Sequence, residues 1–141
     1  AGARRPLVVG DRLDTDIEGA VRAGMDSVLV LTGVTPAADL LRAPAHRRPR
    51  YVAGDLRGLF DGAVDLSVGE PTADRDDGWR LRVGPTGLQL TGTGHLLGAL
   101  RLLCRAAWTG RQLGEVSAGS EAAAAVLREL GLGRVRAASE A

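Results

Sequence analysis

Residues 7–33, "LVVGDRLDTDIEGAVRAGMDSVLVLTG", contain the pattern that decides the fold of the first part of the chain. An apolar run closes at Gly10, as a buried strand of a parallel sheet does. From Ile17 onward, apolar residues recur every three or four positions, which predicts a helix. The Val- and Leu-rich residues 26–33 then predict a second buried strand.

The helix within this stretch carries a signal at each end. Thr15 or Asp16 is expected to cap its amino terminus, because a short polar side chain can accept a hydrogen bond from a free backbone N–H. Gly24 is expected to end the helix, because glycine adopts the left-handed conformation that closes many helices without steric cost.

The same alternation continues further along the chain. Residues 36–43 predict a short helix with Pro36 in its first turn, where proline is tolerated. Residues 49–54 predict a third strand, and residues 55–62 predict a helical turn. Strands that alternate with helices form a parallel sheet with right-handed crossovers, so the sequence predicts one α/β part over residues 1–62.

The remainder of the chain has a different pattern. Residues 63–78 are acidic and aperiodic, which predicts a linker, or an edge strand followed by a loop. Residues 79–91 alternate on both sides of a Gly-Pro-Thr-Gly turn and predict a hairpin. Residues 96–108 and 120–131 predict two helices. We therefore expect residues 79–141 to form a small α+β appendage of the order ββα followed by a further α.

Several single residues of the appendage have structural interpretations. Trp79 and Trp108 are expected to anchor its core, and Cys104 lies in an apolar run where it should be an inert core residue. Ser120 is expected to cap the last helix. His95, at the start of the preceding helix, is expected at the surface.

The composition excludes several classes of function. A net charge of +1 leaves no basic surface for nucleic acid or an anionic membrane. No apolar run reaches the roughly 18 residues that a membrane span needs. The single cysteine fits a reducing cytoplasm, which is the expected location. All 18 basic residues are arginine, so this chain supplies no lysine amine to any reaction. Because it starts with alanine just before a strand, we expect it to be a piece of a longer protein.

Three aspartates follow the first strand within six residues. Asp11 leaves the end of the strand, Asp14 lies in the turn and Asp16 begins the helix. Open parallel sheets bind ligands at the carboxyl ends of their strands, and Mg²⁺ prefers a few carboxylates with phosphate oxygens and water. Asp11 is therefore a candidate Mg²⁺ ligand. On spacing alone a second interpretation stays open, in which the aspartates only cap the helix and fill the turn.

These aspartates belong to a motif that resembles the fourth motif of the haloacid dehalogenase (HAD) superfamily. Residues 5–61 resemble, more narrowly, the branch with phosphoglycolate, pyridoxal phosphate and glycerol 3-phosphate phosphatases. The resemblance rests on "GDRLDTDI", on "AGMDSVLVLTGVT" and on the later pattern P-x-Y-V-x-x-D-L-x-x-L. It implies the carboxy-terminal half of a Rossmann-like core. It also implies Mg²⁺-dependent hydrolysis of a small phosphomonoester, with glycerol 3-phosphate as the expected substrate.

The resemblance also implies roles for single residues of the motif. Asp11 would be the Mg²⁺ ligand that this motif contributes. Asp16 would be an outer-sphere acid that supports the water shell of the metal and orients the lysine of the family. Gly10, Arg12 and Thr15 would shape the loop.

The chain departs from the family pattern in what it lacks. The reaction needs an aspartate nucleophile in an Asp-x-Asp motif after the first strand, a Ser or Thr for the phosphate, a lysine and a cap domain. Asp14-Thr15-Asp16 spells Asp-x-Asp but begins a helix, so Asp14 is not expected to be the nucleophile. We expect the chain alone to be inactive. Its expected partners are the missing amino-terminal half of the same phosphatase and a small phosphorylated substrate.

The appendage contains a second motif, Gln89-x-x-Gly92-x-Gly94, between a strand and a helix. Glycines at such a turn free backbone N–H groups at a helix amino terminus, which suits a pyrophosphate. The motif is similar to the coenzyme-A-binding motif of GCN5-related N-acetyltransferases (GNAT). The resemblance implies a GNAT-like tail in which Gln89, Gly92 and Gly94 form a candidate ligand turn.

Two other functions stay open at this point. The chain could be a non-catalytic regulatory or oligomerisation module that binds an acyl-CoA-like ligand through Gly92 and Gly94. It could also be a receiver-like or dinucleotide-binding α/β domain. Against this last alternative, no G-x-G-x-x-G follows the first strand, and the acidic loop would repel a pyrophosphate that carries no metal.

Overall fold

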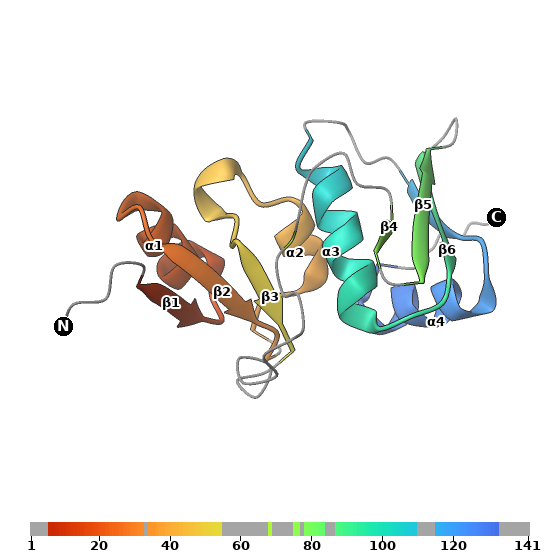
Figure 1. The fold of residues 1–141 in the computed structure, drawn as a ribbon, viewed down its shortest axis with the longest axis horizontal. Helices are drawn as coiled ribbons and strands as arrows, with labels where there is room; N and C mark the ends of the chain where they lie inside the picture. Colours follow the sequence, from red (N-terminus) through yellow and green to blue (C-terminus); the bar gives the residue numbers. More distant parts are fainter. Residues whose placement is uncertain are drawn as a thin grey trace. The chain divides into compact units, whose positions relative to one another are not determined.

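The chain divides into two compact units, Ala1–Val68 and Gly69–Ala141, which are described separately below. The structure, a computed structural model, describes residues 6–32, 34–54, 68, 75–76, 78–83, 87–109 and 115–132 (Figure 1). The helical turn expected at residues 55–62 lies outside the described residues.

The first unit is built on a parallel sheet of three strands, as the sequence predicted. Strands β1 (Leu7–Gly10), β2 (Asp26–Val30) and β3 (Tyr51–Ala53) follow one another in space in the order β1-β2-β3. Gly10 pairs with Leu29, so the carboxyl ends of β1 and β2 lie side by side. Parallel pairing follows because helical segments connect the strands.

The helical segments among the described residues of this unit are short. They are the π-helical turn η1 (Leu13–Ile17), α1 (Glu18–Arg22), α2 (Ala37–Leu41) and the 3₁₀ turn η2 (Ala45–Arg47).

The expected amino-terminal cap of the first helix was wrong, because Arg12 has the extended backbone of the cap position and the winding begins at Leu13. Asp16 lies within η1, and its side chain reaches back to accept the backbone N–H groups of Asp11 and Arg12, which precede the helix. The expected end is confirmed, since Gly24 has a φ of 72°.

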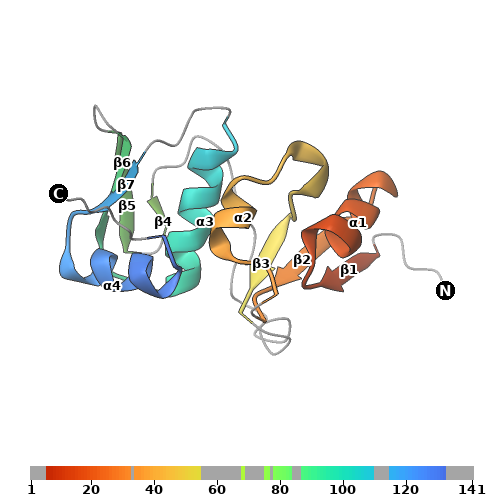
Figure 2. The same cartoon turned by 180° about the vertical axis from the view of Figure 1, so that it is seen from behind.

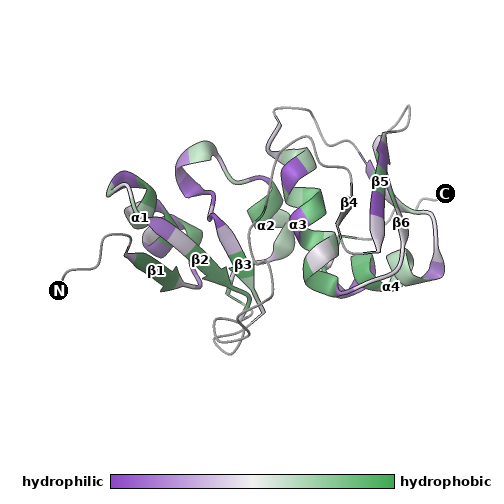
Figure 3. Cartoon of the chain, viewed as in Figure 1, coloured by the Kyte–Doolittle hydropathy of each residue, from purple (hydrophilic) through white to green (hydrophobic). Residues whose placement is uncertain are grey.

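The core of the first unit lies between β2 and β3 and the helices that connect the strands. The buried apolar side chains among the described residues of this unit are Ile17, Ala20, Val28, Leu29, Val30, Ala37, Leu40, Leu41, Ala43, Val52, Ala53 and Val68. Figure 3 shows the apolar colour along β1 and over the carboxyl part of β2. In contrast to β2, β1 is an edge of the described sheet, with Leu7 46% and Val9 38% exposed.

The second unit is an α+β unit whose described residues form a sheet of four strands. Strands β4 (Arg75–Asp76), β5 (Trp79–Val83), β6 (Gly87–Gly92) and β7 (Glu115–Ala118) lie in the order β4-β5-β6-β7 (Figure 2). The predicted hairpin is confirmed, because β5 and β6 pair antiparallel with Leu81 opposite Leu90.

Strand β7 corrects the expected order of this unit. It lies between α3 (Leu96–Ala107) and α4 (Glu121–Glu129) and pairs parallel with β6. No strand was predicted there, because β7 has only four residues and contains one large apolar side chain, Val116. Helix α3 is therefore the crossover between two parallel strands, and α4 packs on β6 and β7.

Side-chain interactions secure the helices of this unit. Ser120 caps α4 as expected, accepting from the Ala123 N–H at 3.2 Å. His95 caps α3, because its Nδ1 accepts from the Leu97 N–H at 3.1 Å. Trp79 is a core anchor as expected, 2% exposed, and its indole N–H donates to the His95 carbonyl. Cys104 is buried, and this burial raises the pKa of its thiol. Within the described residues, no helix has the length and apolarity to cross a bilayer.

Candidate metal-ligand loop at the carboxyl end of β1

Asp11 follows β1 directly and lies where two parallel strands end together. Because Gly10 is in register with Leu29, the loop after β1 lies beside the loop after β2. Thr32, in that second loop, donates its hydroxyl to Oδ2 of Asp11 at 3.1 Å. Asp11 is therefore at the edge of the sheet where open α/β folds bind ligands.

The backbone of this loop is held by Asp16. Its Oδ2 accepts the N–H of Asp11 at 3.2 Å and the N–H of Arg12 at 3.3 Å. A Cβ added at Gly10 would overlap the side chain of Asp16, so glycine is needed at position 10 for this approach. The structure thus brings Gly10, Asp11 and Asp16 together.

A second threonine holds the other side of the Asp11 peptide. The hydroxyl of Thr35 donates to the Asp11 carbonyl at 2.6 Å, and Thr35 is 9% exposed. Sequence reasoning singled out neither Thr35 nor Thr32. The available signal was the pair of hydroxyl residues that follows the second strand in "LTGVT".

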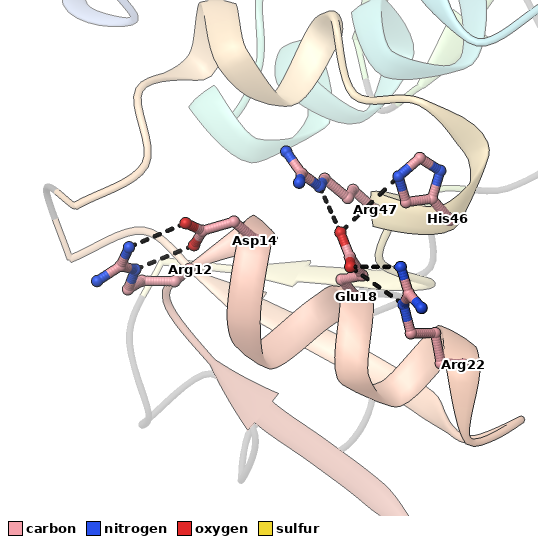
Figure 4. Close-up of polar contacts among 6 residues, drawn as sticks. All are labelled: Arg12, Asp14, Glu18, Arg22, His46 and Arg47. Carbon is pink, nitrogen blue, oxygen red and sulfur yellow. Dashed lines mark hydrogen bonds and ion pairs between the residues drawn. The ribbon is translucent and has the colours of Figure 1, made fainter.

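Arg12 and Asp14 form a surface ion pair beside the loop. Arg12 donates from Nε to Oδ1 of Asp14 at 3.1 Å and from Nη2 to Oδ2 at 3.0 Å (Figure 4). These hydrogen bonds, and then the charge of Arg12, lower the pKa of Asp14. Thr15 is exposed, and its side chain makes no hydrogen bond to the described residues.

Glu18, at the start of α1, joins three basic side chains. It accepts from Arg22 at 3.0 Å and from Arg47 at 2.6 Å, while Nε2 of His46 lies 3.8 Å away (Figure 4). The hydrogen bond from Arg47 is the main reason that the pKa of Glu18 is lowered. This cluster ties η2 to α1.

A pocket of about 460 Å³ adjoins the loop on the side of α2. Its polar lining comes from Arg12, Asp14, Thr35, Asp39, Arg42 and Arg47. Its volume is within the range of small-molecule sites. Asp11 is not among the residues that line this pocket.

The donor set of the described residues fits part of a magnesium site. No three His, Cys, Asp or Glu side chains within the described ranges gather around a point that could hold a metal. Mg²⁺ is commonly bound by one or two carboxylates together with phosphate oxygens and water. Asp11 can supply one such carboxylate, and the other ligands would have to come from elsewhere.

Gly92 of the tail motif is required by its local structure. Gly92 has a φ of 100°, and a Cβ at this position would overlap the Gly78 carbonyl. The Gly92 carbonyl accepts from the Ser120 hydroxyl at 2.8 Å, while Gln89 lies half-buried in β6 and Gly94 is exposed. Because His95 takes up the Leu97 N–H, part of the helix amino terminus is already satisfied. A ligand turn here stays a prediction.

Comparison with known proteins agrees with the division into two parts. Residues 1–59 match the family model of HAD-hydrolase-like proteins, and residues 76–132 match that of the GCN5-related N-acetyltransferase-like domain. The resemblances on which the sequence interpretation depended are therefore confirmed for both parts. The first part of the chain resembles the HAD-type phosphatases, and the second resembles the GNAT-like domain.

Particular relatives make the likeness more specific. The chain is 37% identical to D-glycerol 3-phosphate phosphatase of Mycobacterium tuberculosis, over 93% of this chain and 40% of the relative. Dihydroxyacetone phosphatase of Corynebacterium glutamicum is 34% identical over 43% of this chain and 22% of its own length. A crystal structure of the M. tuberculosis glycerol phosphate phosphatase in complex with magnesium matches with a TM-score of 0.78 and 41% identity.

The match to that structure covers 92% of this chain and 38% of the solved chain. The chain thus spans about 40% of the length of the mycobacterial relative. Both parts of the chain are included in its match to this larger phosphatase.

Proposed function

We propose that this chain is part of a Mg²⁺-dependent phosphomonoester phosphatase, to which it contributes Asp11 as a metal ligand. A bound magnesium would neutralise charge on the phosphoryl group that is transferred. Asp11 would hold the metal, and Asp16 would keep the Asp11 backbone in place. The nucleophile would come from the part of the protein that lies outside this chain.

The position of the Asp11 carboxylate carries this proposal. Oδ2 accepts from Thr32, and both backbone polar groups of Asp11 are bonded by Asp16 and Thr35. Among the described residues, nothing donates to Oδ1. No described residue thus occupies this carboxylate oxygen at the carboxyl edge of the sheet, where a phosphate and a divalent cation would meet.

Glycerol 3-phosphate is the substrate that we propose. Support comes from the name of the mycobacterial relative, with which the chain shares 37% identity across both of its parts. The corynebacterial relative is named for a different substrate, dihydroxyacetone phosphate, which is the alternative that the same assay should include.

The partner that we propose for this chain is the remaining portion of the same phosphatase. Strand β1 is an edge in the described sheet, and Leu7 and Val9 on it are exposed. An apolar edge strand is suited to pair with a further strand, which would cover these side chains. We place the enzyme in the cytoplasm, in line with its one buried, unpaired cysteine.

Hydrolysis of glycerol 3-phosphate tests the proposal. The 141-residue chain is assayed alone, and again joined to the protein segment encoded upstream of it, with and without Mg²⁺. We expect no turnover by the chain alone and Mg²⁺-dependent turnover by the joined protein. Turnover by the chain alone, or metal-independent turnover by the joined protein, would contradict the proposal.

Two matched variants of the joined protein locate the metal ligand. Asp11→Asn removes the charge of the proposed ligand and should abolish Mg²⁺-dependent activity. Asp14→Asn is the control, because it changes a nearby aspartate of η1 whose carboxylate is held at the surface by Arg12. It should leave activity near that of the wild type. Equal effects of the two variants would show that Asp11 is not the ligand.

A further inference from the structure

Asp11 lies in irregular backbone between β1 and η1, so neither a sheet ladder nor a helix satisfies its peptide groups. Backbone N–H and C=O groups that leave water need partners. Asp16 accepts the N–H, and Thr35 donates to the C=O. The orientation of the residue is therefore set by side chains that come from two other parts of the unit.

The Thr35 contact ties the loop to a packed element. Thr35 is 24 residues from Asp11 and lies directly before Pro36, the cap residue of α2. Three residues of α2, Ala37, Leu40 and Leu41, are buried in the core of the unit. A hydrogen bond of 2.6 Å from a side chain that is 9% exposed thus holds the Asp11 carbonyl against a fixed point.

Thr32 acts on the carboxylate itself. Its hydroxyl donates to Oδ2 from a position 21 residues further along the chain, at the carboxyl end of β2. This donation fixes the torsion of the carboxylate and leaves Oδ1 as the oxygen directed elsewhere. Backbone orientation and side-chain orientation are thus controlled separately, by Thr35 and Thr32.

We propose that Thr35 is a positioning residue for the metal-binding carboxylate of Asp11, and that Thr32 orients the same carboxylate. This inference rests on the proposed function of Asp11. A ligand must be held to within about half an ångström of its productive position, and residues that lock it contribute to metal affinity without touching the metal.

The test uses the joined protein and variants that separate the hydroxyl from the shape of the side chain. Thr35→Val keeps the branched shape and removes the donor, whereas Thr35→Ser keeps the donor. Thr109→Val is the control, because Thr109 is an exposed threonine of the second unit whose hydroxyl donates to a backbone carbonyl, that of Ala106, at 2.7 Å. Thr32→Val removes the donor to the carboxylate.

The first readout is the Mg²⁺ concentration that gives half-maximal activity. Loss of one such hydrogen bond should raise it about five- to tenfold in Thr35→Val, and by a smaller factor in Thr32→Val, whose bond is longer and exposed. Thr35→Ser and Thr109→Val should stay within about twofold of wild type, a difference at the scale of a surface substitution. The KM for the substrate at saturating Mg²⁺ should change little in all four variants.

The second readout is direct binding of Mn²⁺, followed by electron paramagnetic resonance, which needs no turnover. The same order of affinities is expected, with Asp11→Asn as the variant that loses binding. If Thr35→Val and Thr35→Ser weaken binding equally, or if neither does, the positioning role is wrong. If wild type and Asp11→Asn bind Mn²⁺ alike, the proposed function itself fails, which is a separate outcome.

Discussion

The carboxylate of Asp16 accepts a hydrogen bond from the backbone N–H of Asp11 at 3.2 Å, five residues back along the chain. The aspartate inside the helical winding therefore holds the aspartate at the end of the strand. A cap residue usually precedes the first turn and accepts an N–H within it, and here the direction is reversed. The reversal leaves Asp11 outside the helix, with its side chain at the edge of the sheet.

Gly10→Ala should disrupt this arrangement, whereas Gly19→Ala should not. A Cβ at Gly10 would overlap the Asp16 side chain, so we expect a loss of stability of about 1–3 kcal/mol, the usual cost of overpacking. Gly19 lies in α1 with no atom within 4 Å of an added Cβ. There alanine should stabilise by about 0.5–1 kcal/mol through helix propensity. Urea denaturation of the two variants compares them, and equal shifts would contradict the steric argument.

Asp16→Ala removes the acceptor of two backbone N–H groups, those of Asp11 and Arg12. We expect it to cost about 1–2 kcal/mol of stability, since each lost bond of this kind is worth about 0.5–1.5 kcal/mol. Asp16→Asn keeps one acceptor oxygen and should lose less. Chemical denaturation measures both variants. A smaller loss in the alanine variant than in the asparagine variant would show that the bonds do not support the loop.

Glu18 should make stability depend on pH in acid. Its pKa is lowered from the usual 4.5, chiefly by the hydrogen bond from Arg47, so the folded state favours the charged carboxylate. The contribution of Glu18 is therefore present above about pH 4.5 and is lost as the pH falls through the lowered pKa. Denaturation of wild type and Glu18→Gln at pH 7 and at pH 3 tests this. The variant should be less stable at pH 7, and the difference should shrink at pH 3. A constant difference would show that the ion pairs do not matter.

His95→Ala should destabilise the second unit by about 1 kcal/mol, the typical cost of losing an amino-terminal cap. The physical reason is that Nδ1 of His95 accepts from the Leu97 N–H in the first turn of α3. His95→Asn offers another good cap and should recover most of the loss. His46→Ala serves as the control, because His46 is exposed and its Nε2 lies 3.8 Å from Oε1 of Glu18, which is too far for a hydrogen bond. Thermal unfolding measures the three variants, and equal effects at the two histidines would refute the cap.

The sequence predicted the parallel sheet of the first unit correctly because each strand is a short apolar run between turn signals. The stop at Gly24 was also predictable, since the left-handed backbone at this position is a local property of the chain. The hairpin of β5 and β6 could be read from the alternation of residues 79–83. In each of these cases the controlling residues lie within a few positions of one another.

Other features could not be predicted from neighbouring residues. Strand β7 has one large apolar side chain, Val116, and exists because β6 offers it a partner across the α3 crossover. The amino-terminal cap of the first helix was misplaced because Thr15 and Asp16 both fit the cap pattern. The side chain of Asp16 packs closely against Gly10, and this contact decides that Asp16 accepts from the backbone of Asp11 and Arg12.

The sequence by itself determined the apolar strands, the helix that follows the first of them and the placement of Asp11 where that strand ends, because these depend on local periodicity and backbone preference. The tertiary structure alone decided that Thr32 and Thr35 meet Asp11. They are 21 and 24 residues away and reach it only because β1 and β2 end side by side in a parallel sheet. Hydrogen bonds between distant segments depend on packing, which no local pattern encodes.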